Sequence, residues 1–468
     1  MDVDHHLFIE QGIRGGTSMI THRYAKANNQ YVEGYNPAEP SSHIMYLDAN
    51  NLYGWAMSQP LPVGDFKWME NVEDFKVEEV PDDHSTGYIL QVDLEYPQHL
   101  HDHHNDYPLA PESMKITHDM LSPYSRLLAA DLQYHPGGVK KLVPNLYNKT
   151  NYILHYRNLK LYLGLGMKLT KIHRILQFQQ KAWLKPYIDL NTQKRAQAKN
   201  AFEKDFFKLM NNSVFGKTME NTRKHVNVEL ITEPSKMKKL VAQPTFKRAK
   251  QFNEHLVAVE RARQKLVLSK PVYTGFTVLD LSKVLMYEFH YHYIQPKYGA
   301  KGQLLFTDTD SLCYHIQTAD VYRDMQPDLA MFDTADYPSD HILHSNLNKK
   351  VIGKMKDETA GDPIQEFVGL RPKMYSFVLK RNGLEKQEKK AKGVKKSVTK
   401  RDIRHADFKN CLFKQTQYEH SMTQIRSQNH QLQTVKLTKT SLSPYDDKRF
   451  ISADGYTTFA HGHYKTRV

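Results

Sequence analysis

The sequence is poor in cysteine, with only Cys313 and Cys411 among its 468 residues. Two cysteines exclude a disulfide framework or a thiolate metal cluster and are typical of a reducing compartment. No run approaches ~18 apolar residues, which excludes a membrane-spanning helix. The first residues lack the basic and apolar segments of a secretory signal peptide. No fixed-period repeat stands out, so solenoid and propeller folds are not expected.

The composition is that of a folded protein. Hydrophobic residues make up 40% of the chain, and 28 Tyr and 20 Phe add bulky side chains for a core. This content excludes disorder throughout. At about 150 residues per domain, the length suggests roughly three domains.

Positive charge exceeds negative charge, with 65 Lys and Arg against 51 Asp and Glu, a formal net charge of +14. Eleven Lys or Arg are concentrated in residues 380–404. A basic protein favours an anionic partner, most commonly nucleic acid. Charge alone does not separate that partner from a membrane surface.

Three aspartates follow apolar segments that read as strands. Asp48 ends the apolar run 43–47, and Asp308 and Asp310 lie in a tight turn between two apolar runs over 303–316. Mg²⁺ takes oxygen ligands, often from one or two carboxylates plus substrate phosphates. Because Asp is also common in solvated turns, the pattern leaves both a metal site and an ordinary turn open.

A helix is expected to begin at Asn191 or Thr192 and to run through Gly216. Within it, Lys204, Lys208 and Asn212 recur every four residues up to Gly216 and form one slowly drifting stripe. Such lysines suit a triphosphate, and a solvated lysine face is the alternative.

Other patterns predict further local structure. We expect a strand over 87–96, a helix over 122–138, mainly helix over 152–216 with a break near 185–186, and an amphipathic helix over 277–293. The segment around Lys373 and Tyr375 reads as a strand, on which these two side chains would share a face.

The order of the motifs IRGG, YLDANNLYG, KLMNNSVFG, FTDTDS and KMY is more informative than any one of them. The chain resembles the protein-primed family B DNA polymerases, and among them those of Polinton (Maverick) transposons and related viruses. The resemblance implies an α+β right-hand fold of palm, fingers and thumb, with an antiparallel palm sheet. It also implies primer–template DNA, dNTPs and a terminal protein as partners, and no membrane.

The resemblance assigns regions to this fold. It implies a palm built from 1–65 and 269–378, fingers at 151–220 and a thumb at 379–468. It also implies two insertions, at 66–150 and 221–268, that resemble terminal-protein regions 1 and 2. The second insertion would serve strand displacement and processivity.

The resemblance also implies roles for single residues. Asp48, Asp308 and Asp310 would be catalytic and would bind two Mg²⁺ ions, or Mn²⁺, with Asp310 the stronger direct ligand and Asp308 supportive. Tyr53 would be the steric gate against a ribose 2′-hydroxyl. The remaining nucleotide-binding residues would be Lys204, Lys208, Asn212, Phe215 and, as a further phosphate ligand, Arg195. The DNA- and primer-binding residues would be Gly15, Gly16, Ser213, Gly216, Lys373, Tyr375, Lys392, Lys395 and Lys396.

The sequence departs from the family pattern at four positions. Gly54 replaces a proline, and Ile13, Phe215 and Phe306 each replace a tyrosine. Because only fourteen residues precede Gly15, we expect no proofreading exonuclease within this chain. Asp93 and Glu95 spell an exonuclease motif but follow Asp48, so we interpret them as part of a strand.

The sequence therefore predicts a DNA-directed DNA polymerase that transfers deoxynucleotides to a primer 3′-hydroxyl or a terminal-protein hydroxyl by a two-metal mechanism. The location is unknown but intracellular, and nuclear for a eukaryotic transposon or virus. The alternative is a non-catalytic DNA-binding relic of a transposon polymerase. A reverse transcriptase is a weaker alternative, because Tyr53 and the FTDTDS hairpin suit DNA polymerases better.

Overall fold

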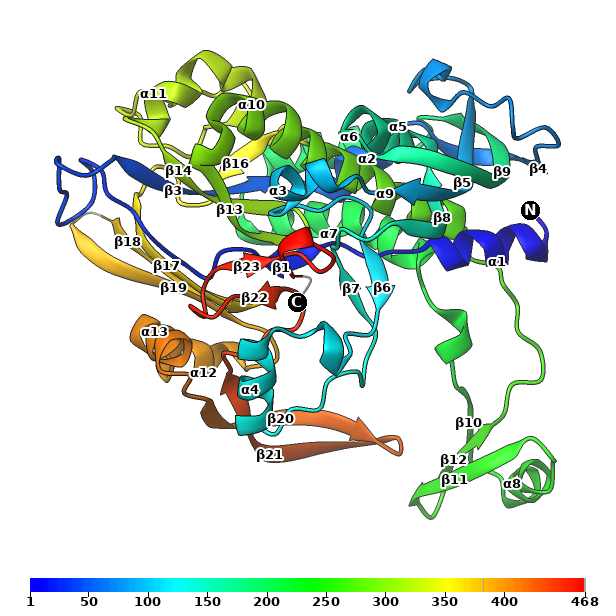
Figure 1. Cartoon of the computed structure of the whole chain (residues 1–468). Helices are drawn as coiled ribbons and strands as arrows, with labels where there is room; N and C mark the ends of the chain where they lie inside the picture. The colour runs from blue at the N-terminus through cyan, green and yellow to red at the C-terminus, as the bar shows by residue number, and fades with distance from the viewer. Residues whose placement is uncertain (382, 467–468) are drawn as a thin grey trace.

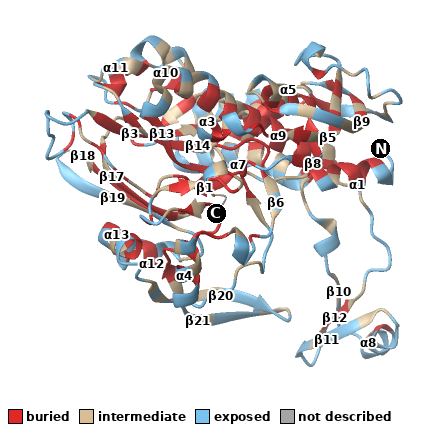
Figure 2. Cartoon of the chain, in the orientation of Figure 1, coloured by how far each residue is buried: buried red, intermediate tan, exposed pale blue. Residues whose placement is uncertain are grey.

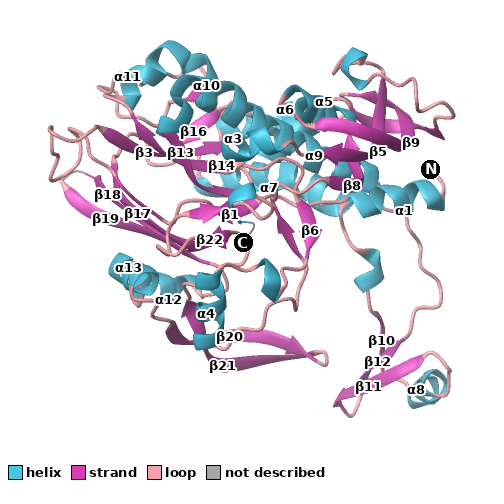
Figure 3. Cartoon of the chain, in the orientation of Figure 1, coloured by secondary structure: helices cyan, strands magenta, loops and turns pink. Residues whose placement is uncertain are grey.

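The structure is a computed structural model that describes residues 1–381 and 383–466. Residue 382, within the basic run, and residues 467–468, at the end of the expected thumb, lie outside the described residues. Helices and mainly antiparallel sheets alternate along the chain (Figure 3), so the fold is α+β as predicted. In the described part of the chain, no helix is long and apolar enough to cross a membrane.

The largest sheet joins strands from distant parts of the sequence in the order β1-β13-β14-β3-β17-β18-β19, with three short strands at its side. Its strands are β1 (Ser18–Ile20), β2 (Tyr24–Lys26), β3 (Ser42–Ala49), β13 (Gly302–Asp308), β14 (Ser311–Gln317), β15 (Phe332–Asp333), β16 (Met355–Asp357), β17 (Ile364–Arg371), β18 (Met374–Arg381) and β19 (Leu384–Ala391). The predicted strand before Asp48 and the hairpin around Asp308 are confirmed. The sheet continues through β19, beyond residue 378, so the basic run begins on this sheet.

A long helix, α9 (Val272–Glu288), lies beside this sheet and continues as a π-helix over Phe289–Ile294. The prediction of an amphipathic helix over 277–293 is wrong in one respect, because α9 is buried nearly all round (Figure 2). It contacts α1 (Val3–Gly12), α2 (Leu52–Met57), α5 (Tyr156–Gly164) and α7 (Ala201–Thr218). A helix enclosed by other helices has no solvated face to keep polar.

A second sheet has the order β4-β9-β5-β8. Its strands are β4 (Leu61–Trp68), β5 (Thr86–Glu95), β8 (Lys149–His155) and β9 (Lys168–Lys181). The prediction of mainly helix over 152–216 is therefore wrong for β8 and β9. Since β9 pairs with strands on both sides, its conformation is set by tertiary pairing rather than by local preference.

The single helix predicted up to Gly216 is two helices, α6 (Lys185–Gln197) and α7. Asn200 caps α7, because its side chain accepts a hydrogen bond of 2.9 Å from the Glu203 amide. The capping signal therefore lies eight or nine residues later than predicted. The predicted break near 185–186 is confirmed as the start of α6, with Pro186 in its first turn.

Residues 227–261 form a small unit that projects from the body (Figure 1), and we call it the projecting module. It contains β10 (Asn227–Ile231), α8 (Pro234–Val241), β11 (Phe246–Asn253) and β12 (Leu256–Arg261). Its far end meets the hairpin β20 (Tyr418–Gln428) and β21 (Gln431–Leu442), where Arg248 donates a hydrogen bond of 2.6 Å to Asn429. Segments 181 residues apart in sequence are thus joined.

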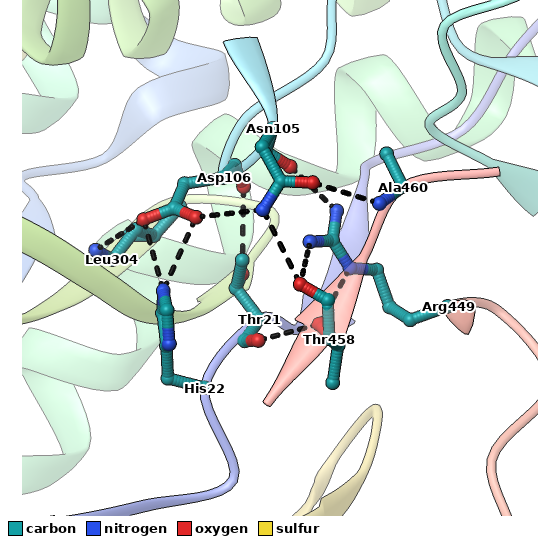
Figure 4. Close-up of polar contacts among 8 residues, drawn as sticks. All are labelled: Thr21, His22, Asn105, Asp106, Leu304, Arg449, Thr458 and Ala460. Carbon is teal, nitrogen blue, oxygen red and sulfur yellow. Dashed lines mark hydrogen bonds and ion pairs between the residues drawn. The ribbon is translucent and has the colours of Figure 1, made fainter. Parts of the chain in front are cut away.

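The C-terminal segment folds back onto the body (Figure 4). Arg449 donates hydrogen bonds to Thr458 Oγ1 (2.9 Å) and to the Asn105 carbonyl (2.6 Å), and Thr458 donates to the Thr21 carbonyl (2.6 Å). The Asp106 carboxylate accepts from His22 and from the Leu304 amide, both at 3.2 Å. This network holds residues 449–460 beside β1 and β13.

Shorter elements complete the insertion and the C-terminal region. They are α3 (His101–His104), β6 (Glu112–Met114), α4 (Pro123–Asp131), β7 (Lys141–Val143), α12 (Lys396–Arg401), α13 (His405–Phe413), β22 (Phe450–Ile451) and β23 (Thr458–Phe459). The helix predicted over 122–138 ends at Asp131 as α4, because Gln133 has a positive φ of 55° that a right-handed helix does not allow.

Candidate active site

Two neighbouring strands bring Asp48 and Asp310 together. In the register of β14 and β3, Ser311 lies opposite Asp48, and the Ala49 amide donates a hydrogen bond of 2.7 Å to the Asp310 carbonyl. Both strands are buried along most of their length, so they hold these carboxylates rigidly at one end of the sheet. The geometry joins residues that are 262 positions apart in the sequence.

The carboxylates of this site repel one another, and nearby lysines compensate for their charge only in part. Burial, together with the charges of Asp310 and Glu358, raises the pKa of Asp48 to about 8. Burial, with Asp308 nearby, also raises the pKa of Asp310. Carboxylates that repel one another become stable as anions when a cation binds between them. The oxygen donors and their unrelieved charge fit a hard divalent cation such as Mg²⁺.

Asp308 has a different environment. Its carboxylate forms an ion pair with Lys373 at 2.7 Å, and its side chain is nearly buried. Across the residues that the structure describes, no group of three or more His, Cys, Asp or Glu could hold a metal ion. The structure therefore brings Asp48 and Asp310 together, with Asp308 turned to Lys373.

The predicted strand position of Lys373 is wrong. Lys373 lies in the turn between β17 and β18 with a φ of +63°, so it does not share a strand face with Tyr375. Tyr375 is buried, its ring stacks on Phe306 with centroids 4.2 Å apart, and its hydroxyl lies 3.1 Å from the Tyr46 hydroxyl. Tyr375 thus supports the sheet under the site, while the Lys373 ammonium sits beside Asp308.

Two aromatic rings from different elements stack beside the carboxylates. Tyr53 on α2 and Phe215 on α7 have ring centroids 4.4 Å apart and an interplanar angle of 28°. Burial and the charge of Asp310 raise the pKa of Tyr53 to about 12, which keeps its hydroxyl protonated. This pair closes one wall of the site and joins α2 to α7.

The remaining residues of the α7 motif differ in exposure. Lys208 is exposed and close enough to Asp48 to oppose the rise in its pKa. Asn212 is half-buried, and the Ser213 hydroxyl donates to the Met210 carbonyl at 3.1 Å, within the helix. Gly216 faces open space. Lys204 and Arg195 lie further along the same wall, near Lys350.

The two glycines predicted to contact DNA lie beside the turn that contains Asp308 and Asp310. A Cβ on Gly16 would come within 2.3 Å of the Thr309 side chain, so only glycine fits there. Thr309 has a φ of +72° and donates its amide to the Thr17 carbonyl at 2.7 Å. Gly15 is exposed with open space around it.

A cavity of about 370 Å³ lies next to this turn. It is lined by Gly16, Lys373, Lys392 and residues 445–448, among others. Lys395 and Lys396 are exposed beyond it, and Lys395 donates a hydrogen bond of 3.0 Å to the Thr423 carbonyl on β20. Of the residues expected to hold DNA or primer, Gly16, Lys373 and Lys392 thus border this cavity.

Sequence reasoning missed three residues of this region. Glu358 and Lys390 act on the pKa of Asp48, and the Lys390 ammonium lies 5.6 Å from the Tyr375 ring centre. The third is Lys350, which lies near Lys204 and Arg195. Lys390 stood within a run of similar lysines, so nothing in its local sequence distinguished it.

Asp93 and Glu95 lie on β5 in the second sheet, as expected of a strand. Asp93 pairs with His173 at 2.8 Å, and Glu95 pairs with Lys168 at 3.2 Å. Each carboxylate therefore interacts with its own basic side chain on the neighbouring strand.

Comparison with known proteins places this geometry in a family. The model of the family "DNA polymerase type B, organellar and viral" matches residues 21–294. No curated protein sequence matches the chain.

Solved structures of phi29 DNA polymerase share the fold. The ternary complex with primer–template DNA and incoming nucleotides has a TM-score of 0.54 at 16% identity, over 94% of this chain and 63% of that one. The complex with single-stranded DNA has a TM-score of 0.53 at 15% identity, over the same shares of each chain. The chain thus spans less than two thirds of the phi29 polymerase chain. Because the family model matches more than half of its residues, the chain belongs to the type B DNA polymerases of organelles and viruses.

Proposed function

We propose that this chain is a template-directed DNA polymerase module, which transfers deoxynucleotides from dNTPs to a primer 3′-hydroxyl. The observation that carries the proposal is the pairing of Asp48 and Asp310 at the end of β3 and β14, facing Lys208 and the Tyr53–Phe215 stack. Carboxylates on one side and a cation on the other match the two ends of a metal-bound triphosphate.

In this proposal, Asp48 and Asp310 would hold two Mg²⁺ ions, or Mn²⁺, which supply charge stabilisation to the reacting phosphate. The primer 3′-oxygen forms a bond to the α-phosphorus, the bond to the bridging oxygen breaks, and pyrophosphate leaves. Lys208 and Lys204 bind the triphosphate, and Arg195 adds a further positive charge. Positioning and electrostatics account for most of such catalysis.

The aromatic pair would select and orient the nucleotide. Tyr53 would stand against the ribose 2′-position, and the Phe215 ring would pack on the new base pair. Asn212, Ser213 and Gly216 would shape the same wall. Their positions on α7, between Lys208 and the end of the helix, support these roles.

The DNA would enter from the side of the 370 Å³ cavity. Gly15, Gly16 and Lys373 would lie along the primer strand. Lys392, Lys395 and Lys396 would bind its phosphates. Tyr375 would support the sheet under the site. Asp308 would act through its ion pair with Lys373. The projecting module, which contacts the β20–β21 hairpin through Arg248, would serve processivity and strand displacement.

The biological setting is proposed with the function. The chain would act inside the cell with a terminal protein, whose hydroxyl replaces the primer 3′-hydroxyl at initiation, in replication of a mobile element or virus. If that element or virus is eukaryotic, the chain would act in the nucleus. In the same proposal, 1–65 and 269–378 form the palm, 151–220 the fingers and 379–468 the thumb, and 66–150 and 221–268 are terminal-protein regions.

A primer-extension assay with Mg²⁺, dNTPs and a primer–template duplex tests the proposal. We expect extension that depends on the template and stops when EDTA is added. DNA binding without any extension, with Mg²⁺ or with Mn²⁺, would instead favour a non-catalytic DNA-binding relic. That alternative gives no role to the mutual repulsion of Asp48 and Asp310.

A further inference from the structure

A loop that belongs to none of the polymerase motifs lies against the motif that contains Asp48. In residues 346–354, the Gly353 amide donates to the Asn50 carbonyl at 2.8 Å, and the Asn50 amide donates to the Lys354 carbonyl at 2.9 Å. Asn50 is two residues after Asp48. The loop is therefore fixed to the backbone that carries the catalytic carboxylate.

One buried carboxylate holds Lys350 within this loop. Asp333 Oδ2 accepts hydrogen bonds from the Lys350 amide at 2.8 Å and from Asn50 Nδ2 at 2.7 Å. Lys350 has a φ of +59°, a conformation that costs energy for a residue with a side chain. The two hydrogen bonds to Asp333 compensate for that cost, so the position of Lys350 is fixed relative to Asn50.

The loop also contacts the apolar cluster that contains Tyr53 and Phe215. Ile352 packs in the same apolar cluster as Tyr53, Phe215 and Val214. Lys350, two residues earlier, thus stands between the sheet that carries Asp48 and the helices that carry Lys204 and Arg195.

Two further cations lie near Lys350. Lys350, Lys204 and Arg195 form no ion pair within the described residues, and Arg195 Nε is buried without a hydrogen-bond partner. Burial and then the charges of Lys204 and Arg195 lower the pKa of Lys350, and the charge of Asp336 opposes this only in part, so both cations lie close enough to Lys350 to repel it. Converging cations that repel one another are relieved by a multivalent anion.

We propose that Lys350 is a further phosphate-binding residue, which contacts the triphosphate of the incoming nucleotide from the palm side, opposite Lys204 and Arg195. The inference rests on the proposed function, because it deepens the description of the same nucleotide site. The triphosphate would thus be held between two walls, one on the α6 and α7 helices and one on the loop fixed by Asp333.

The decisive comparison is between Lys350→Ala and Lys349→Ala. Lys349 is exposed on the same loop and loses the same charge, which makes it a matched control. We expect Lys350→Ala to raise KM for dNTP about tenfold, the loss of one hydrogen bond to a charged group. We expect kcat and the Kd for primer–template to change less than threefold, and Lys349→Ala to leave KM within twofold. Lys350→Arg should restore most of the affinity.

Calorimetric binding of inorganic tripolyphosphate separates this inference from the proposed function. We expect Lys350→Ala to bind it about tenfold more weakly than the parent. The inference is wrong if the parent protein extends primers but Lys350→Ala leaves both KM and tripolyphosphate affinity unchanged. It is also wrong if Lys349→Ala changes KM and tripolyphosphate affinity as much as Lys350→Ala does. If the parent protein never extends a primer but loses tripolyphosphate affinity with Lys350→Ala, the polymerase proposal fails and the anion site stands. Lys350→Gln keeps the length of the side chain and replaces Lys350→Ala if that variant does not fold.

Discussion

The strands that carry Asp48 and Asp310 and the projecting module of residues 227–261 are both sheets, but they are built differently. β3, β13 and β14 are buried along nearly their whole length (Figure 2), whereas the apolar cluster of the module has three buried members, Ile231, Leu240 and Val259. A core of three side chains stabilises a sheet far less than a core shared with the whole body.

This difference in core size indicates which of the two regions has to be rigid. The carboxylates that we propose to hold metal ions need closely fixed positions, and they lie at the ends of strands that cannot shift without disturbing a close-packed core. The module and the segment that leads to it instead touch the rest of the chain through polar contacts, namely Arg248 with Asn429, His430 with Glu260 at 3.3 Å, and Arg223 with Glu10. Such contacts are individually weak at the surface.

The largest effect is expected from Asp310→Asn. It removes one of the paired negative charges, so extension should fall about a thousandfold or more while affinity for primer–template stays within about threefold. Gel-based extension and DNA-binding titrations measure both. Arg248→Ala in the module is the matched control, and we expect it to retain extension of a short primer. Equal losses of extension activity in the two variants would mean that the module is needed for extension as much as Asp310 is.

The next largest effect concerns stability. Leu312 is completely buried on β14, and Leu312→Ala should lower the free energy of unfolding of the body by about 3 kcal/mol. Val259 is equally buried in the module, yet Val259→Ala should leave the main thermal transition unchanged and increase proteolytic cleavage within 221–268. Calorimetry and limited proteolysis of the full chain distinguish these outcomes. A single transition lowered by both variants would show that the module and the body unfold together.

Acid should lower the free energy of unfolding of the body by protonating Glu366. Burial opposes ionisation of Glu366, but hydrogen bonds from His405, Lys409 and Tyr24 lower its pKa to about 2, from an ordinary value near 4.5. A depressed carboxyl pKa stabilises the fold above the unfolded pKa, and this stabilisation is lost as pH falls from about 4.5 to about 2.

Glu366→Gln should therefore reduce stability by about 2 kcal/mol at pH 7 and make no difference near pH 2. Denaturant unfolding of parent and variant across this range measures the difference. Glu260 of the module also has a lowered pKa, mainly through its hydrogen bond with Arg248, and Glu260→Gln serves as the control. We expect a smaller and salt-sensitive change there, because the Arg248 side chain is half exposed. A pH-independent difference for Glu366→Gln would contradict the assignment.

The smallest effect concerns salt. Reversing the charges of Lys392, Lys395 and Lys396 should flatten the slope of log K against log salt by up to about 0.9 for each DNA phosphate that is no longer neutralised. The control reverses Lys238, Lys239 and Lys247 of the module. We expect the first set to have the larger effect, because Lys392 borders the cavity beside Gly16 and Lys373. Lys389 and Lys390 are left unchanged, because their ammonium groups contact the Ile403 carbonyl and the Tyr46 hydroxyl.

Some elements could be predicted because their signal is local. The apolar runs before Asp48 and around Asp308 are short, bounded by turn residues and buried, so their strand structure was readable from sequence. The helix prediction for β9 is wrong because a strand paired on both sides lacks a regular alternation of polar and apolar residues. The boundary between α6 and α7 is not predicted because several residues there could cap a helix.

The sequence by itself determined the order of the motifs, the basic charge and the strands that end in carboxylates, because these depend on neighbours along the chain. Only the tertiary structure decided that Asp48 meets Asp310, that Asp308 turns to Lys373 and that the loop with Ile352 packs with Tyr53 and Phe215. Each of these contacts joins segments tens to hundreds of residues apart. Their pairing follows from strand register and from buried hydrogen bonds such as those of Asp333, which no local pattern encodes.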